Sequence, residues 1–259
     1  CRIVQPTRLD QWVDRNGEAH DGCEASTCVT DDDCDDGVLC TTDQCDGDGI
    51  CNHIPNSSIC SDSFDCTLDV CDAGLGCQYT TRDALCPLSH EICTLDFGCA
   101  HELWVDQACV ASGTCGIGTA SAPFATIEES LVQTRSTVEA TINVIRIRSG
   151  SYSENRIRYE LVSNPVILVG DIGTEWVTTD ETALEVKSGA FVRVEQLQMT
   201  GRQRVVYCRD TSICELVSVE LVNCEHEGIR GDDDSHVYVE RSLIQGNLEV
   251  GILIESRAN

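Results

Sequence analysis

Charged residues near the C-terminal end form the first candidate for chemistry. Asp232, Asp233 and Asp234 are consecutive, and Arg230 and His226 precede them closely. Paired carboxylates can supply a general acid and a general base, and a guanidinium group can stabilise developing negative charge. The preceding segment has no second run of carboxylates at the equivalent position. We therefore prefer a solvated turn and keep catalysis as the alternative.

A second acidic group lies near the N-terminus. The segment from Asp31 to Asp48 contains eight aspartates and no lysine or arginine. Within it, Asp43, Asp46 and Asp48 surround Gly47 in the phrase DQCDGDG, and such carboxylate oxygens are the ligands that calcium prefers. The phrase lacks the full EF-hand pattern and its closing glutamate. A calcium site and a solvated acidic face both remain open.

The histidines offer less. His53, His90, His101 and His236 have no partner at the spacing of a metal site or a catalytic triad. We expect them to be surface or packing residues.

The 19 cysteines follow an internal repeat. The pattern that begins at Cys34 recurs from Cys60 at an offset of 26 residues, and a third, incomplete copy begins at Cys86. At least four residues separate any two cysteines, so no Cys-x-x-Cys metal motif is present, and we expect disulfides formed outside the cytosol. Spacing leaves their pairing open. The cysteines expected in disulfides are Cys34, Cys40, Cys45, Cys51, Cys60, Cys66, Cys71, Cys77, Cys86, Cys93, Cys99, Cys109, Cys115, Cys208 and Cys214.

Each cysteine repeat has too few large apolar residues to bury a core, so disulfides must stabilise it. The phrase CTTDQCD, followed by a turn, a cysteine and NHIPN, resembles the extracellular repeats of slime-mould matrix proteins and of secreted proteins from predatory and other social bacteria. The resemblance covers residues 30 to 100. It implies an extracellular spacer or matrix role and carries over no catalytic residue.

The first residue, Cys1, resembles the N-terminal cysteine of a mature bacterial lipoprotein, which is acylated. In that family Arg2, in place of aspartate, implies delivery to the outer membrane. An arbitrary chain boundary or a disulfide at Cys1 would explain the same residue. The stretch that follows, to residue 22, has no clear periodicity and is interpreted as a tether.

Beyond residue 100 the chain resembles the initial segment of extracellular right-handed parallel β-helices. The resemblance rests on a strand-like LWVD, a glycine-containing loop, the phrase PFATI and the phrase SGSYSE. It implies a short amphipathic helix after Pro123 that covers the open end of the β-helix. Phe124, Ile127, Leu131 and Val132 would be its apolar residues.

The periodicity of the later segment supports a solenoid independently. Apolar residues align at offsets of 22 and 23 residues in three columns: Val194, Leu216 and Val239; Met199, Leu221 and Ile244; Val206, Ile229 and Ile252. Short alternating strands at that period fit the coils of a parallel solenoid.

Two cysteines fall on the same register. Cys208 aligns with Gly231 and Ile254, and Cys214 aligns with Val192 and Val237, at core-facing positions. These two cysteines and Cys224 either bridge across neighbouring strands or pack as small reduced side chains.

These observations predict a mainly β protein: disulfide-rich small repeats followed by a right-handed parallel β-helix. The expected domains are a tether over 1–22, cysteine repeats over 23–100 and a β-helix over 101–259. The net charge of −27 disfavours nucleic acid as a partner. No apolar run approaches the length of a membrane span.

We expect a cell-surface structural or adhesive lipoprotein of the outer membrane. It would bind a protein or glycan partner through the β-helix and the membrane through acylated Cys1. A carbohydrate-active lyase or hydrolase and a subunit of a larger envelope complex are the alternatives.

Overall fold

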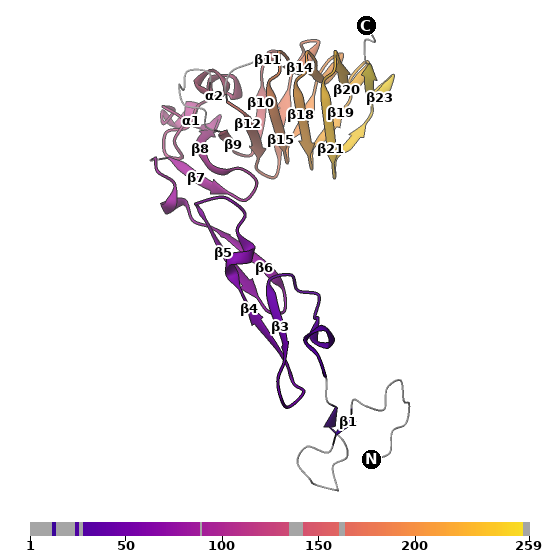
Figure 1. Cartoon of the computed structure of the whole chain (residues 1–259). Helices are drawn as coiled ribbons and strands as arrows, with labels where there is room; N and C mark the ends of the chain where they lie inside the picture. Colours follow the sequence, from indigo (N-terminus) through magenta and orange to yellow (C-terminus); the bar gives the residue numbers. More distant parts are fainter. Residues whose placement is uncertain are drawn as a thin grey trace. The chain divides into compact units, whose positions relative to one another are not determined.

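The computed structural model describes residues 12–13, 24–25, 28–88, 90–134, 142–160 and 164–255. The chain forms two compact units, Cys1–Leu85 and Cys86–Asn259 (Figure 1). Both units are mainly β, which confirms the predicted fold class. Cys1, Cys23 and most of the expected tether lie outside the described residues. Within the tether region, β1 (Trp12–Val13) pairs with β2 (Glu24–Ala25) in antiparallel fashion.

The first unit repeats one small motif, a 3₁₀ turn followed by a β-hairpin. In the first copy η2 (Asp31–Cys34) precedes β3 (Thr41–Cys45) and β4 (Cys51–Pro55). In the second copy η3 (Ser57–Cys60) precedes β5 (Thr67–Asp72) and β6 (Gly76–Thr81), and η4 (Asp83–Leu85) follows. Cys45 pairs with Cys51 across the first hairpin, and Cys71 pairs with Cys77 in the same way across the second. The sequence repeat is therefore a structural repeat.

Disulfides take the place of an apolar core in this unit. They include Cys28–Cys45, Cys34–Cys51, Cys40–Cys71 and Cys60–Cys77. Cys40, Cys60 and Cys71 form the buried cluster, whereas Leu39 is 91% exposed. Cys40–Cys71 joins the first repeat to the second, a pairing that spacing alone left open.

The second unit begins with the third cysteine copy. Its hairpin consists of β7 (Glu91–Thr94) and β8 (Gly98–Val105), and Cys86–Cys99 closes it. Strand β8 then pairs in parallel with β9 (Ile142–Ile147). One strand thus belongs both to the last cysteine hairpin and to the first sheet of the solenoid, and it crosses the boundary expected at residue 100.

The rest of the second unit is a parallel β-helix of five coils, and each coil gives one strand to each of three sheets (Figure 1). The first sheet contains β9, β12 (Val166–Gly170), β15 (Phe191–Glu195), β18 (Ile213–Val217) and β21 (His236–Glu240). The second contains β10 (Gly150–Ser153), β13 (Thr174–Val177), β16 (Gln198–Thr200), β19 (Glu220–Val222) and β22 (Leu243–Gln245). The third contains β11 (Ile157–Tyr159), β14 (Thr182–Val186), β17 (Arg204–Cys208), β20 (Glu227–Asp232) and β23 (Val250–Glu255).

The predicted columns are the actual strand registers. Leu216 pairs with Val194 and Val239, Leu221 with Met199 and Ile244, and Ile229 with Val206 and Ile252. In the inner coils these side chains are fully buried, because alternate residues of each strand face the interior. The third of these registers extends the parallel pairing into β23, as the periodicity predicts.

A short helix packs on the first coil. Helix α2 (Ile127–Thr134) packs against β8 and β9, with Ile127 and Leu131 buried and Val132 exposed. Glu154 fixes its N-terminus: its two carboxylate oxygens accept the backbone N–H groups of Ile127 at 2.5 Å and Glu128 at 2.9 Å. The glutamate of the SGSYSE phrase therefore supplies acceptors for two of the N–H groups that the start of a helix leaves without an intrahelical partner.

Helix α1 (Ala108–Ser112) precedes the loop that leads to α2. The Cys109–Cys115 disulfide closes this loop. Helices α1 and α2 and the loop between them thus connect β8 to β9, the first strand of the first coil.

Candidate functional site

The third sheet of the solenoid carries a column of charged and aromatic residues. Arg158, Glu185, Tyr207 and Arg230 are aligned in register on β11, β14, β17 and β20. Their neighbours along the strands are buried in the core, so alternation places this column on the outer face. We name the surrounding group the Tyr207 face. It consists of Arg158, Glu185, Arg204, Tyr207, Arg209, Glu227, Arg230 and Asp232.

Tyr207, Arg230 and Asp232 are in direct contact. The Tyr207 hydroxyl donates to Oδ2 of Asp232 at 2.8 Å, and Nε of Arg230 donates to the same oxygen at 3.0 Å. Asp232 is 8% exposed. Burial raises the pKa of Tyr207, and its hydrogen bond to Asp232 raises that pKa further. Tyr207 therefore stays protonated at neutral pH and is a donor there, not a base.

Arginines surround the Tyr207 ring. The guanidinium carbons of Arg204, Arg209 and Arg230 lie 5.3, 5.6 and 5.9 Å from the ring centroid. Such contacts favour planar cations over an aromatic face. They bring together side chains from β17, the residue after it and β20.

Buried glutamates neutralise these arginines. Glu185 accepts from Arg158 at 2.9 Å and lies 3.0 Å from Arg209. Glu227 accepts from Arg204 at 3.1 Å. Glu185 and Glu227 are 5% and 6% exposed, so each needs its arginine partner. The face therefore combines four arginines, three carboxylates and one aromatic ring, held together by these contacts.

The structure divides the five residues proposed for catalysis. Arg230 and Asp232 lie together in the Tyr207 face. His226 precedes β20 and pairs with Glu249 at 2.9 Å, whereas Asp232 ends that strand. At about 3.3 Å per residue the strand separates His226 from Asp232 by about 20 Å. No proton can pass directly between them.

Asp233 and Asp234 occupy a stacked turn. Their φ angles are 53° and 59°, and those of Asp210 and Thr211 in the preceding coil are 55° and 62°. The Thr211 N–H donates to the Asp233 carbonyl at 3.0 Å, so the two turns are hydrogen-bonded to each other. Aspartate tolerates the left-handed region better than most residues. The backbone conformation explains these two aspartates without a catalytic role.

Two of the residues expected to bind calcium, Asp43 and Asp46, make contacts with different groups. Asp46 caps the hairpin turn, where its Oδ1 accepts from the N–H groups of Asp48 and Ile50 at 3.0 and 2.8 Å. Asp43 instead contacts His53 and Asp36. The expectation that His53 has no partner is therefore wrong: strand pairing sets it opposite Asp43, ten residues away in sequence.

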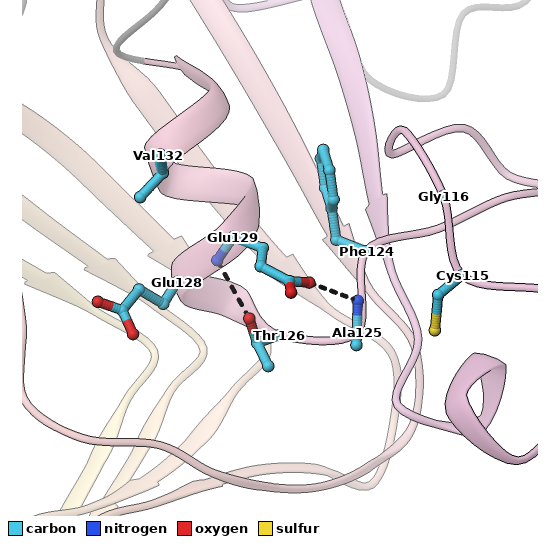
Figure 2. Close-up of a pocket in the computed structure, with 8 residues that line it drawn as sticks. All are labelled: Cys115, Gly116, Phe124, Ala125, Thr126, Glu128, Glu129 and Val132. Carbon is cyan, nitrogen blue, oxygen red and sulfur yellow. Dashed lines mark hydrogen bonds between the residues drawn. The ribbon is translucent and has the colours of Figure 1, made fainter.

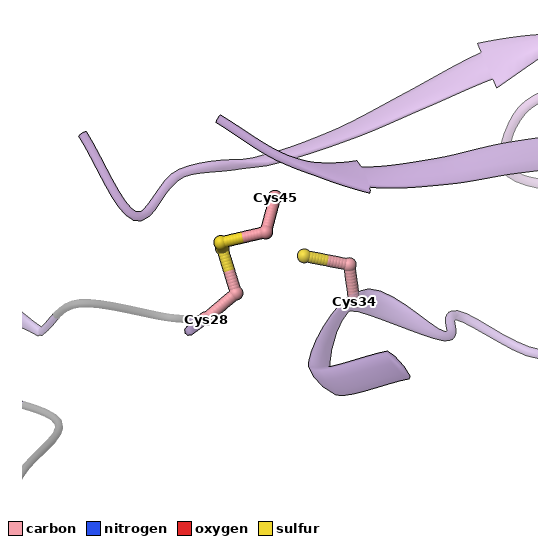
Figure 3. Close-up of side chains that lie close together, drawn as sticks. All are labelled: Cys28, Cys34 and Cys45. Carbon is pink, nitrogen blue, oxygen red and sulfur yellow. A yellow bond between two sulfur atoms is a disulfide. The ribbon is translucent and has the colours of Figure 1, made fainter. Parts of the chain in front are cut away.

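Cysteine sulfurs also gather in the first unit. The sulfur atoms of Cys28, Cys34 and Cys45 lie within 4.8 Å of one another, and Figure 3 shows the Cys28–Cys45 disulfide beside Cys34. Cys34 is bonded to Cys51, so none of the three is available as a thiolate ligand. All fifteen cysteines expected in disulfides are oxidised in the structure.

In the solenoid, Cys208–Cys214 bridges successive strands, β17 and β18. Cys224 is the free cysteine within the described ranges. It is buried, its sulfur donates to Oδ1 of Asn247 at 2.7 Å, and burial raises its pKa. It is therefore an unreactive packing residue.

A groove lies beside α2, which the sequence did not indicate (Figure 2). Its volume is about 730 Å³. Two of its polar groups serve the helix end: Glu129 accepts the Ala125 N–H at 3.0 Å, and Thr126 accepts the Glu129 N–H at 3.1 Å. The lining residues are Cys115, Gly116, Phe124, Ala125, Thr126, Glu128, Glu129 and Val132.

The sequence prediction missed Tyr207, Glu185, Glu227 and Arg204. Tyr207 and Arg230 are 23 residues apart, and Glu185 and Tyr207 are 22 apart. The period that revealed the apolar columns would have revealed this polar column too. Comparison of the chain with protein-family models, curated proteins and solved structures found no match. In the described part of the chain, no helix is both long and apolar enough to span a bilayer.

Proposed function

We propose that the protein is an extracytoplasmic structural or adhesive protein that uses its β-helix as a binding surface for a protein or glycan partner. The single observation that carries this proposal is the Tyr207 face. Its donors, acceptors and ring are fixed by ion pairs across consecutive coils, with Arg158 still 52% exposed at its side chain. An extended partner would meet a rigid, pre-organised surface.

The contacts within the face favour binding over catalysis. A general acid or base must be free to exchange a proton at the operating pH. Asp232 is held by Tyr207 and Arg230, and the raised pKa of Tyr207 moves it away from neutrality. The arginines are each committed to a carboxylate, so none is a free charge stabiliser.

The cysteines support the proposed extracytoplasmic location. Disulfide-rich repeats form in oxidising compartments. We propose that the protein lies at the outer membrane or cell surface, with the cysteine repeats as a spacer.

A matched pair of arginine variants tests the binding role. Arg158 belongs to the Tyr207 face, whereas Arg202 lies outside it with a 61% exposed side chain. Both substitutions to alanine remove one positive charge. The full chain is passed over immobilised neutral and acidic polysaccharides and envelope protein fractions. We expect Arg158→Ala to weaken binding about tenfold and Arg202→Ala to leave it unchanged. Equal effects of the two variants would reject the face as the binding surface.

The alternative function is a carbohydrate-active lyase or hydrolase. Contact among Tyr207, Arg230 and Asp232 is the observation that favours it, since a hydroxyl, a guanidinium and a carboxylate converge there. Depolymerisation of a polysaccharide by the wild type, abolished by Asp232→Asn, would support this alternative.

A further inference from the structure

Three potential metal ligands converge in the first cysteine repeat. Nδ1 of His53 lies 3.0 Å from Oδ1 of Asp43 and 3.2 Å from Oδ2 of Asp36. All three atoms lie within 4.8 Å of one another. The side chains of His53, Asp36 and Asp43 are 34%, 21% and 16% exposed, so an ion can reach them from solvent.

One nitrogen thus faces two carboxylates. Nδ1 carries at most one hydrogen, and one hydrogen cannot fully satisfy two anionic oxygens. A divalent cation in its place would compensate both carboxylates at once and use the Nδ1 lone pair.

The other oxygens of the two carboxylates are fixed by the chain. Oδ1 of Asp36 accepts the Val38 N–H at 2.8 Å and the Thr41 hydroxyl at 3.2 Å. Oδ2 of Asp43 accepts the Asp36 N–H at 3.3 Å. These bonds leave one oxygen of each group directed at His53. Hydrogen bonds of this kind orient ligands in metal sites.

The second repeat supplies an internal comparison. Asp62 and Asp69 take the places of Asp36 and Asp43: the Asp62 N–H donates to Asp69 at 3.2 Å, and the Thr67 hydroxyl donates to Asp62 at 2.8 Å. Tyr79 pairs with Asp69 in the position of the histidine. Oδ1 of Asp69 is buried and has no hydrogen-bond partner. The same fold therefore forms without the histidine, so His53 is not needed to build the repeat.

We propose that Asp36, Asp43 and His53 bind a divalent transition-metal ion, for which Zn²⁺ is the best fit. Zinc accepts one imidazole and two carboxylates as three protein ligands, with the fourth position open to water or a partner. Ligand atoms of a tetrahedral site with bonds of about 2.0–2.2 Å are about 3.3–3.6 Å apart. The observed spacings of 3.0 and 3.2 Å need to open by only a few tenths of an ångström. Calcium takes oxygen ligands, so a calcium site would not require His53.

The test uses substitutions that exchange the two repeats. His53→Tyr gives the first repeat the residue that the second already has, and Tyr79→His gives the second repeat the complete ligand set. Zn²⁺ is titrated by calorimetry into the oxidised full chain and into both variants. His226→Gln controls for a histidine elsewhere, and intact mass before and after reduction verifies that every variant keeps its disulfides.

We expect one specific Zn²⁺ site in the wild type. It should be lost in His53→Tyr, retained in His226→Gln and accompanied by a second site in Tyr79→His. Proton release should accompany binding, because the metal displaces the Nδ1 proton. Equal zinc affinity of wild type and His53→Tyr would overturn the proposal, as would a calcium affinity that is the same in both proteins with no specific zinc site.

Discussion

The Tyr207 hydroxyl donates a 2.8 Å hydrogen bond to the Asp232 carboxylate, and this bond joins the third coil of the solenoid to the fourth. Tyr207 lies on β17 and Asp232 ends β20. Since Asp232 is a buried charge, it depends on such donors. The bond therefore connects two coils on the outer face of the solenoid, in addition to the packing of apolar side chains in its core.

Removal of this donor is expected to destabilise the second unit. Tyr207→Phe keeps the ring and deletes the hydroxyl, so Asp232 loses one of its two donors, and Arg230 remains. A hydrogen bond to a charged group contributes about 1.5–3 kcal/mol, and the remaining ion pair reduces the loss to about 1–2 kcal/mol. Urea unfolding measures the change. Tyr238→Phe, at a tyrosine that is 55% exposed, is the control and should be neutral; equal losses would contradict the role of this bond.

Tyr207 also makes stability depend on pH. Its pKa in the folded state is raised by burial and by Asp232, above the ordinary value of 10.0. The folded state therefore holds the phenolic proton more tightly than the unfolded state does, and this contribution is complete below the unfolded pKa. It is lost as the pH rises through the folded pKa. The difference in the free energy of unfolding between the wild type and Tyr207→Phe should therefore shrink above about pH 10. A difference that grows with pH would contradict this prediction.

Glu154 is expected to be the main anchor of the cap helix. Glu154→Ala removes the acceptor of two N–H groups at the start of α2, and loss of a helix cap costs about 1–2 kcal/mol. Glu175 on β13 is an exposed glutamate, so Glu175→Ala should change the free energy of unfolding by less than about 0.5 kcal/mol. Hydrogen exchange should report faster opening of α2 in Glu154→Ala alone. Unchanged protection of α2 would show that apolar packing suffices.

The Cys40–Cys71 bond is expected to contribute more than Cys28–Cys45, Cys34–Cys51 or Cys60–Cys77. It spans 31 residues, whereas each of those three bonds spans 17. In the chain-entropy model a longer loop is constrained more, and this one gives about 3–4 kcal/mol. A variant with alanine at Cys40 and Cys71 should be cleaved by protease between the two hairpins faster than a variant with alanine at Cys34 and Cys51. Faster cleavage of the Cys34 and Cys51 variant would contradict the role of Cys40–Cys71 in joining the two repeats.

The apolar architecture was predictable because it is periodic. Val206, Ile229 and Ile252 must all face the same interior, so their spacing in the sequence reports the length of a coil. The cap was recognised from short phrases, but the bonds of Glu154 to α2 were not. They depend on where a loop returns, which spacing does not encode.

The candidate sites were less predictable. His226 and Asp232 are close in sequence, but an intervening extended strand separates them. Conversely, Asp43 and His53 are ten residues apart and meet because a hairpin turn sets their register. Contacts between side chains on different strands depend on strand register. The register can be predicted only when the position of each turn is known. The Cys40–Cys71 bond was undetermined for the same reason.

The most direct test of the central claim measures binding and cleavage of polysaccharide together. The purified full chain is incubated with alginate and with dextran, and both the bound fraction and the length distribution of the chains are recorded. For a glycan partner, we predict saturable binding that Arg158→Ala weakens, with no shortening of the polysaccharide. For a protein partner, we predict binding to neither glycan and an Arg158-dependent affinity for an envelope protein. Shortening of either polysaccharide by the wild type, abolished by Asp232→Asn, would contradict the structural and adhesive role.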